Sequence, residues 1–137
     1  MTECGNSEVT STLKTHFLDT HNQRRGQLAS GSLTDAYGGI TLPKAKDMCE
    51  LIWNCDLEKQ AIDYVRKCPT DTDTTLNDQS PGENFYRISS ADLPYYRDGI
   101  KKAVTEWWKV YRWYNTPGTS ATFLSSHANS PVSSYTR

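Results

Sequence analysis

Glu83 stands in the stretch SPGENFYRIS, residues 80–89, directly after a glycine turn and before a run of strand-forming residues. A carboxylate in such a position could act as a general acid or base at the mouth of a cleft. Acid–base catalysis usually divides the work between two titratable groups, and no second group stands at an identifiable spacing from Glu83. Glu83 is therefore equally well interpreted as a polar residue that begins a half-buried strand.

The three histidines, His16, His21 and His127, do not form a pattern that binds metal. On a helix His16 and His21 would point about 140° apart, and there is no H-E-x-x-H motif or zinc-type spacing of cysteine and histidine. His21 falls on an apolar stripe, which favours a hydrogen-bonded core role. A serine nucleophile has no G-x-S-x-G motif to support it, and Ser126 and His127 are merely adjacent. We expect no catalytic residue, no metal site and no cofactor.

The run WWKVYRWY, residues 107–114, places two basic residues among five aromatic ones. Such interleaving can stack bases or sugars. Core packing is the simpler interpretation, because a single helical stripe takes up Val104, Trp107, Trp108 and Tyr111. Trp113 and Tyr114 lie beyond that stripe and could serve a surface role.

The four cysteines are Cys4, Cys49, Cys55 and Cys68, and no two of them form a C-x-x-C pair. Structural disulfides in an oxidising compartment are one reading, and buried free thiols in the cytosol are the other. A helix over 57–67 would hold Cys55 and Cys68 roughly 20 Å apart, which is too far for a bridge. Cys49–Cys55 would need a sharp break between the two residues. The remaining pairing is Cys4–Cys55 with Cys49–Cys68, each bridge contributing about 2–4 kcal/mol.

The apolar periodicity predicts three helical regions that would position these residues. An amphipathic helix begins near Thr10 or Ser11 and stops at Gly31. A second helical region covers 43–68, with a break near 54–56 and Asp56 as the cap of its later part. The remaining predictions are loops at 30–43 and 69–82, a short strand at 82–89, a third helix at 95–114, and a loop from 115 onward.

Length and charge set further bounds. The 137 residues predict a single domain over 1–137, and the net charge of −1 gives no field that would attract nucleic acid or an anionic membrane. No apolar run approaches the roughly 20 residues that span a bilayer. The start Met1-Thr2-Glu3 lacks the features of a signal peptide, so a secreted protein would be expected here in a form whose leader has been removed.

Several stretches in order resemble the superfamily of cysteine-rich secretory proteins, antigen 5 and pathogenesis-related 1 proteins. They are FLDTHNQRRGQLASG, PKAKDMCELIWNCDLEKQAIDYVRKC, and GENFYRIS followed by the tryptophan-rich helix. The opening CGNSEVT, the helix after Cys55 and its Arg-Lys-Cys end are most similar to the activation-associated secreted proteins of parasitic nematodes. This resemblance covers nearly the whole chain, from Cys4 to Arg137.

The resemblance implies an α+β fold, an α-β-α sandwich, and a cleft that in many members holds two histidines and two glutamates. Glu83 of Gly-Glu-Asn matches the first glutamate of that cleft. The histidine upstream of it has no counterpart, the second glutamate falls at Val110, and the second histidine at Ser134. Glu83 and Ser134 are thus expected to be the remnant of a cleft. The chain also ends where the family continues through its central strands, so the sandwich is expected to lack its C-terminal strands.

The resemblance further implies a secreted, non-enzymatic protein that binds a host or extracellular partner and modulates immunity. Two other functions stay open at this point. One is a carrier of sterol or lipid, because the family has apolar grooves between its helices. The other is a hydrolase or metal-dependent enzyme that uses Glu83.

Overall fold

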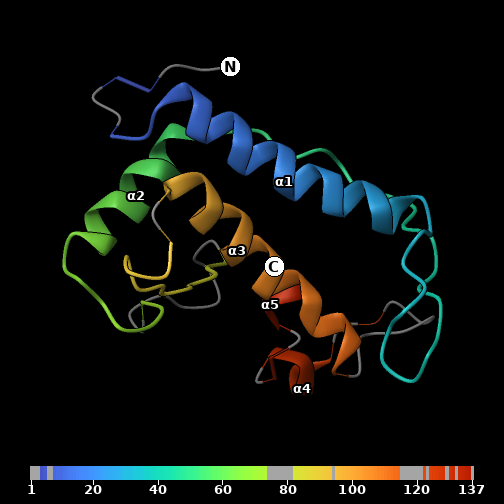
Figure 1. Ribbon diagram of the computed structural model, residues 1–137. Coiled ribbons are helices and arrows are strands. Elements are labelled where there is room, and N and C mark those ends of the chain that lie inside the picture. Colours follow the sequence, from blue (N-terminus) through green and yellow to red (C-terminus); the bar gives the residue numbers. More distant parts are fainter. Residues whose placement is uncertain are drawn as a thin grey trace.

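The computed structural model describes residues 4–5, 8–73, 82–93, 95–114, 122, 124–128, 130–131 and 133–136. The ordered elements in Figure 1 are all helical: α1 (Ser11–Ala29), α2 (Cys55–Val65), α3 (Tyr96–Trp108), the 3₁₀ helix η1 (Lys109–Arg112), α4 (Ser125–Ala128) and α5 (Ser133–Thr136). Helices α1 and α3 pack side by side, while α2 lies at one end of this pair and α5 contacts α3.

The first helix begins and ends where the sequence predicts. The Thr10 hydroxyl accepts a hydrogen bond from the Leu13 N–H at 3.3 Å, which satisfies one of the free amides of the first turn. At the other end Gly31 has φ +72°, and a Cβ there would lie 2.7 Å from the Lys44 side chain. The backbone conformation therefore favours glycine, and a side chain at this position would also have to displace the Lys44 side chain.

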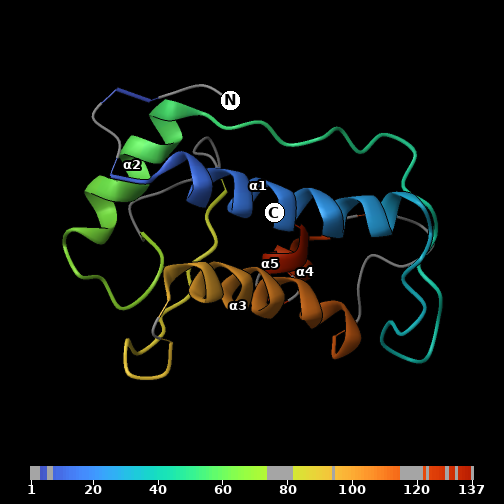
Figure 2. The same ribbon diagram turned by 45° about the horizontal axis from the view of Figure 1, so that its top comes forward.

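The predicted helix over residues 43–54 is wrong, because this segment is extended and runs alongside α1 (Figure 2). The side chain of Asn22 binds both backbone groups of Leu51, at 3.0 Å and 2.8 Å. Arg25 donates to the Cys49 carbonyl at 2.9 Å from its terminal nitrogen. These contacts satisfy backbone groups that a helix would pair internally, so the tertiary structure overrides the local helical pattern.

The predicted strand at 82–89 is extended but forms no ladder in the described part of the chain. There the β pairing consists of a bridge between Ala36 and Ile40. The expected α-β-α sandwich is thus not confirmed by the described residues, which are rich in helix. Two smaller differences concern the C-terminal half: the third helix changes to 3₁₀ geometry at Lys109, and the predicted loop after 115 contains α4 and α5.

The hydrophobic core is small and lies at the C-terminal ends of α1 and α3. Leu33, Ala36 and Leu42 from the loop over 30–43 cluster with Tyr111, and Leu28 and Trp108 pack against them. The Tyr37 N–H donates to the Tyr111 carbonyl at 2.9 Å, which fastens this loop to η1. Of the predicted stripe in the third helix, Trp108 and Tyr111 therefore pack in this core and Val104 is buried, whereas Trp107 lies outside the cluster.

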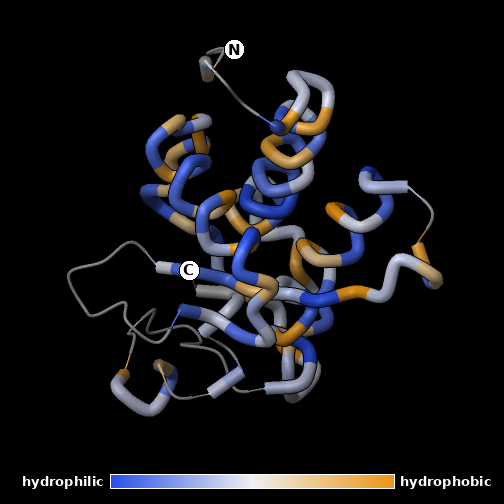
Figure 3. Tube along the Cα trace, turned by 90° about the vertical axis from the view of Figure 1, so that its left-hand side faces the viewer, coloured by the Kyte–Doolittle hydropathy of each residue, from blue (hydrophilic) through white to orange (hydrophobic). Residues whose placement is uncertain are grey.

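Large hydrophobic side chains also lie on the outside of the molecule. Figure 3 shows hydrophobic stretches alternating with hydrophilic ones along the coloured parts of the trace, and Ile52 and Tyr96 are 85% and 86% exposed. Among the described helices, none has both the length and the apolar character that crossing a bilayer takes.

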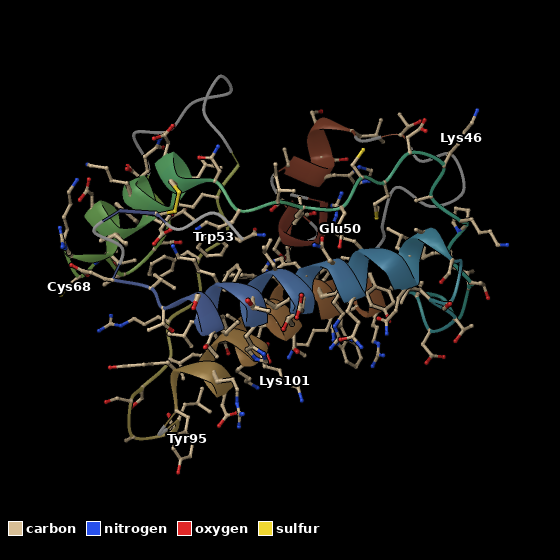
Figure 4. The ribbon with its side chains drawn as sticks, turned by 90° about the horizontal axis from the view of Figure 1, so that it is seen from above. Lys46, Glu50, Trp53, Cys68, Tyr95 and Lys101 are labelled. Carbon is tan, nitrogen blue, oxygen red and sulfur yellow. A yellow bond between two sulfur atoms is a disulfide. The ribbon has the colours of Figure 1, made fainter. Side chains whose placement is uncertain are left out.

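A disulfide and an ion pair hold the N-terminal segment and the start of α1 to the start of α2. Cys4 and Cys55 form a disulfide, one of the two bridges that the sequence analysis expected. Beside it, Glu58 accepts a hydrogen bond from the Trp53 indole at 2.6 Å and pairs with Lys14 of α1 at 2.9 Å. Figure 4 shows the disulfide and Trp53 near the same end of α2.

The second expected bridge, Cys49–Cys68, is not formed, and both residues are exposed free thiols. Figure 4 shows Cys68 beyond the far end of α2, well separated from Glu50, the neighbour of Cys49. The reason is the extended path of residues 43–54, since Arg25 holds the backbone of Cys49 against the later part of α1.

Candidate functional site

A cavity of about 560 Å³ lies where α1, α2 and α3 meet the extended segment that contains Glu83. Its volume is within the range of small-molecule sites, about 300–1,000 Å³. Helices α1 and α3 supply aromatic rings, and α2 supplies both apolar and charged side chains. The lining residues are Phe17, His21, Leu57, Gln60, Ala61, Asp63, Tyr64, Val65, Lys67, Asp73, Gly82, Glu83, Asn84, Phe85 and Trp107.

One side of the cavity is aromatic. Phe17 stacks on His21 with ring centroids 4.6 Å apart, and Trp107 lies 6.5 Å from Phe17 and 6.1 Å from His21. The Trp107 indole N–H donates to the Phe85 carbonyl at 3.1 Å. This hydrogen bond fixes the extended segment to α3 and with it the position of the residues next to Phe85.

His21 serves as a neutral, hydrogen-bonded member of this aromatic side. Its Nδ1 atom lies 2.8 Å from the Phe17 carbonyl oxygen, which can only accept, so Nδ1 carries the proton. Burial lowers the pKa of His21, and the positive charge of Arg25 lowers it further, while the hydrogen bond to Phe17 opposes both. The structure thus confirms that His21 is hydrogen-bonded, but it places His21 half-buried in the cavity wall and not in the hydrophobic core.

Another part of the cavity lining is charged and comes from the end of α2 and the segments that follow. Asp63 pairs with Lys59 at 2.6 Å and with Arg66 at 3.6 Å, so its charge is balanced locally. Lys67 lies over the Tyr64 ring, 6.0 Å from its centroid. Asp73 and Glu83 complete this side.

The pKa of Tyr64 responds to the negative charges in this part of the cavity. Its hydroxyl donates to the Asp71 carbonyl at 2.7 Å. Burial raises the pKa of Tyr64, and the negative charges of Asp73, Glu83 and Asp71 raise it further. The carboxylates of Asp73, Glu83 and Asp71 are therefore close enough to Tyr64 to act on its hydroxyl.

Glu83 and Ser134, the two predicted remnant residues, do not lie together in the cavity. Glu83 is half-buried and lines the cavity, whereas Ser134 in α5 is not among the lining residues. The Ser134 hydroxyl can donate to the Trp107 carbonyl at 3.1 Å, and its own carbonyl accepts from the Asn84 side chain at 3.1 Å. Ser134 therefore supports the cavity wall next to Glu83 without facing the cavity. Val110, in η1, is also absent from the lining.

Sequence reasoning found Glu83, His21 and Trp107 but did not place them together. It also did not identify Asp63, Tyr64, Lys67 and Asp73 as site residues. One sequence signal was available for this part of the cavity. The helical periodicity predicts that Leu57, Ala61 and Val65 share a face, and all three line the cavity. No sequence signal distinguishes Asp73 from the other acidic residues of its polar loop.

A different cluster brings together groups that can bind metal. One sulfur atom each from Cys4 and Cys55 and a carboxylate oxygen of Glu58 lie within 4.8 Å of one another. The two sulfurs are bonded to each other, and Glu58 is paired with Lys14. These groups are therefore committed to the junction between α1 and α2, where they stabilise the fold.

Comparison with known proteins agrees with this architecture. The chain is 31% identical over 103 residues to the Ancylostoma secreted protein of Ancylostoma caninum, a match that covers 75% of the chain and 24% of that protein. It is 32% identical over 112 residues to Tabinhibitin 4 of Tabanus yao, covering 77% of the chain and 42% of that protein. The chain thus spans from about a quarter to less than half of these relatives.

The fold matches that of a protein whose crystal structure has been solved. The crystal structure of Na-ASP-1 matches the whole chain and 35% of its own length with a TM-score of 0.70, at 23% sequence identity. The family model for cysteine-rich secretory proteins matches residues 18–135. The chain therefore belongs to the cysteine-rich secretory protein family, the CAP family.

Proposed function

We propose that the chain is a secreted, non-enzymatic CAP-family protein whose task is to bind a host or extracellular partner and so to modulate immunity. The observation that carries this proposal is the state of the cavity between α1, α2 and α3. Three of its polar residues are engaged in structural contacts: His21 with Phe17, Asp63 with Lys59 and Arg66, and Trp107 with Phe85. A cavity built in this way supports binding better than turnover.

Two further observations support secretion. A disulfide such as Cys4–Cys55 persists in an oxidising compartment. The Ancylostoma relative carries secretion in its name. Expression in a eukaryotic secretory system, followed by intact-mass analysis, tests this part of the proposal. Recovery of the protein in the medium with one intramolecular disulfide is expected, and a fully reduced protein retained in the cell would contradict it.

Binding to a partner is tested with purified components. The secreted protein is immobilised, and defined serum proteins and leukocyte receptor ectodomains are passed over it by biolayer interferometry. A saturable response with a measurable Kd is expected for at least one of them. The absence of any saturable response, together with no effect on host leukocytes, would refute the proposal.

A carrier of sterol or neutral lipid is the second candidate, favoured by the apolar lining that Phe17, Phe85, Leu57 and Val65 contribute. Displacement of a fluorescent sterol distinguishes it from a protein-binding role. If the protein were instead a hydrolase or metal-dependent enzyme that uses Glu83, replacing Glu83 with glutamine would abolish turnover and leave thermal stability unchanged. Under the proposed function no turnover exists to be lost, and Glu83→Gln alters binding alone.

A further inference from the structure

We infer that two copies of the chain pair through the outer edge of the extended segment over residues 43–54, in an antiparallel register that sets the two Cys49 residues opposite each other. The inference goes beyond the proposed function, because this edge lies outside the cavity between α1, α2 and α3. Two features of the segment carry it: a row of unbonded backbone groups, and charges that complement those of a second copy.

The inner edge of the segment is bonded to α1. The Asn22 side chain binds both backbone groups of Leu51, at 3.0 Å and 2.8 Å, and Arg25 donates to the Cys49 carbonyl at 2.9 Å. Residues two apart along an extended chain direct their backbone groups to the same edge. The edge that faces α1 is therefore occupied.

The outer edge of the segment is open. The backbone groups of Met48, Glu50 and Ile52 alternate with those of Cys49 and Leu51, so they point away from α1. Within the described part of the chain, none of these three residues has a hydrogen bond to its backbone. Figure 2 shows the segment beside α1 at the margin of the molecule, and Ile52 is 85% exposed. Such an edge is a template for a strand of another chain.

The charges along the segment complement those of a second copy in one register. Lys46 and Glu50 are exposed, lie apart along the segment in Figure 4, and belong to no ion pair among the described residues. In an antiparallel pair centred on Cys49, Met48 stands opposite Glu50 of the second copy. Lys46 is then the diagonal neighbour of the same Glu50, which is an attractive pairing. The two-fold symmetry repeats this contact on the other side of the axis.

The neighbouring registers lack this complementarity. An axis at Glu50 would set the two Glu50 carboxylates directly opposite each other, which is destabilising. An axis at Leu51 would move Lys46 away from Glu50 of the second copy and remove the attraction. The charges therefore select the register with its axis at Cys49, and a second copy supplies both the backbone groups and the charges that this edge accepts.

Cys49 then lies on the two-fold axis. Because its own backbone groups face α1, the two Cys49 residues form a non-hydrogen-bonded pair, in which the Cα atoms of an antiparallel ladder lie about 4.5 Å apart. Disulfides span Cα distances of about 4.4–6.8 Å. Cys49 is an exposed free thiol, so the pairing can be trapped as a disulfide, although it does not require one.

The pairing is short and therefore weak. A bend at residues 46–47 ends the extended stretch, so the ladder contains about four main-chain hydrogen bonds, exchanged between Met48 and Glu50 of the two copies. Interfaces that bury less than about 1,200 Å² are typical of transient association. We expect a monomer at low protein concentration and a growing share of dimer as the concentration rises.

Disulfide trapping on the complete chain tests the inference. Glutathione disulfide oxidises two Cys49 thiols to one disulfide between two copies and is itself reduced to two molecules of glutathione. Non-reducing electrophoresis measures the rate of dimer formation, and peptide mapping identifies the bridge. Cys68→Ser, which retains Cys49, should form the dimer at least about ten times faster than Cys49→Ser, which retains Cys68. Both thiols are exposed, but the pairing raises the effective concentration of the second thiol at Cys49 alone.

Variants in the Cys68→Ser background assign the trapping to the edge. Glu50→Pro removes an outward N–H that has no partner in the folded chain and keeps the extended conformation, so it should slow trapping by about tenfold. Lys46→Glu should slow trapping about threefold, and Lys46→Glu with Glu50→Lys should restore the parent rate, because the diagonal pair forms again with its charges exchanged. Lys101→Glu makes the same charge change on α3, away from the edge, and should have no effect.

Three results would overturn the inference. They are equal trapping rates for the Cys49 and Cys68 thiols, an unchanged rate in folded Glu50→Pro, and failure of the exchanged charges to restore the rate. Thermal melts establish that each variant is folded, and the charge variants carry the test if Glu50→Pro does not fold. Binding of a host partner is measured separately, so the inference and the proposed function can each fail alone.

Discussion

Lys14 in α1 and Glu58 in α2 form an ion pair whose side chains are only 2% and 4% exposed, with Nζ and Oε2 2.9 Å apart. Glu58 also accepts from the Trp53 indole, and Lys14 lies 5.7 Å from the centre of the Trp53 ring. Two charges buried this deeply are tolerated because each compensates the other. The pair therefore ties α1 to α2 near the point where the disulfide ties the N-terminal segment to α2.

Removing one member of this pair should destabilise the fold strongly. Glu58→Gln leaves Lys14 buried without a counter-charge and is expected to lower the free energy of unfolding by about 3–5 kcal/mol. The double variant Lys14→Met with Glu58→Gln keeps an acceptor for Trp53 and removes both charges, so it should be more stable than Glu58→Gln alone. Urea denaturation measures both, and a double variant less stable than Glu58→Gln would contradict this account of the pair.

The disulfide at the same junction should make a comparable contribution. Cys4 and Cys55 are 51 residues apart, and closing a loop of that length is worth about 4 kcal/mol. The double variant Cys4→Ser with Cys55→Ser is therefore expected to melt at a clearly lower temperature. The matched control is Cys49→Ser with Cys68→Ser, which should stay within about 0.5 kcal/mol of the parent because both thiols are exposed.

Alkylation tests the connectivity directly. Iodoacetamide without reductant should modify Cys49 and Cys68 and leave Cys4 and Cys55 unmodified, and peptide mapping identifies the sites. A protein that takes up no label until it is reduced would show that Cys49 and Cys68 are also bridged.

The two ends of the first helix were predictable because their signals are local. Thr10 caps through its own hydroxyl, and Gly31 stops the helix through its own φ angle. The path of residues 43–54 was not predictable, since it depends on Asn22 and Arg25 from a different element. The same distinction separates Glu83, which a local motif marks, from Asp73, which reaches the cavity only through the path of its loop.

The contact between Asn22 and Leu51 should hold the extended segment against α1. Asn22→Ala removes the hydrogen-bond partners of the Leu51 N–H and carbonyl. It is expected to lower the free energy of unfolding by about 1–3 kcal/mol. Hydrogen exchange should show faster exchange of the Leu51 amide in this variant. Gln23→Ala, an exposed neighbour in α1, is the control and should leave that amide protected. Unchanged Leu51 protection in Asn22→Ala would show that the segment is held by other contacts.

Stability should fall as the solution becomes mildly acidic, and His21 is one cause. Burial lowers the pKa of His21 in the folded protein, while the unfolded chain takes up the proton near pH 6.5. Between these two pKa values the unfolded state binds more protons than the folded state. The contribution of His21 to the free energy of unfolding is therefore fully present above about pH 6.5 and declines below it. His21→Gln should show a shallower decline. An NMR titration midpoint for His21 at or above 6.5 would refute the assignment.

The cap of α2 offers the sharpest comparison between a sequence pattern and the folded chain. The pattern favoured Asp56, but the Asn54 side chain accepts from the Asp56 and Leu57 amides at 2.9 Å and 3.0 Å. Asn54→Ala is therefore expected to lower the free energy of unfolding by about 1 kcal/mol. Asp56→Ala loses only a favourable charge in the first turn, worth about 0.3–1 kcal/mol and reduced by salt. Thermal denaturation of both variants at low and high salt separates the two effects: a salt-independent loss belongs to the cap. If Asp56→Ala is the more damaging at high salt, Asp56 is the true cap and α2 begins later than Cys55.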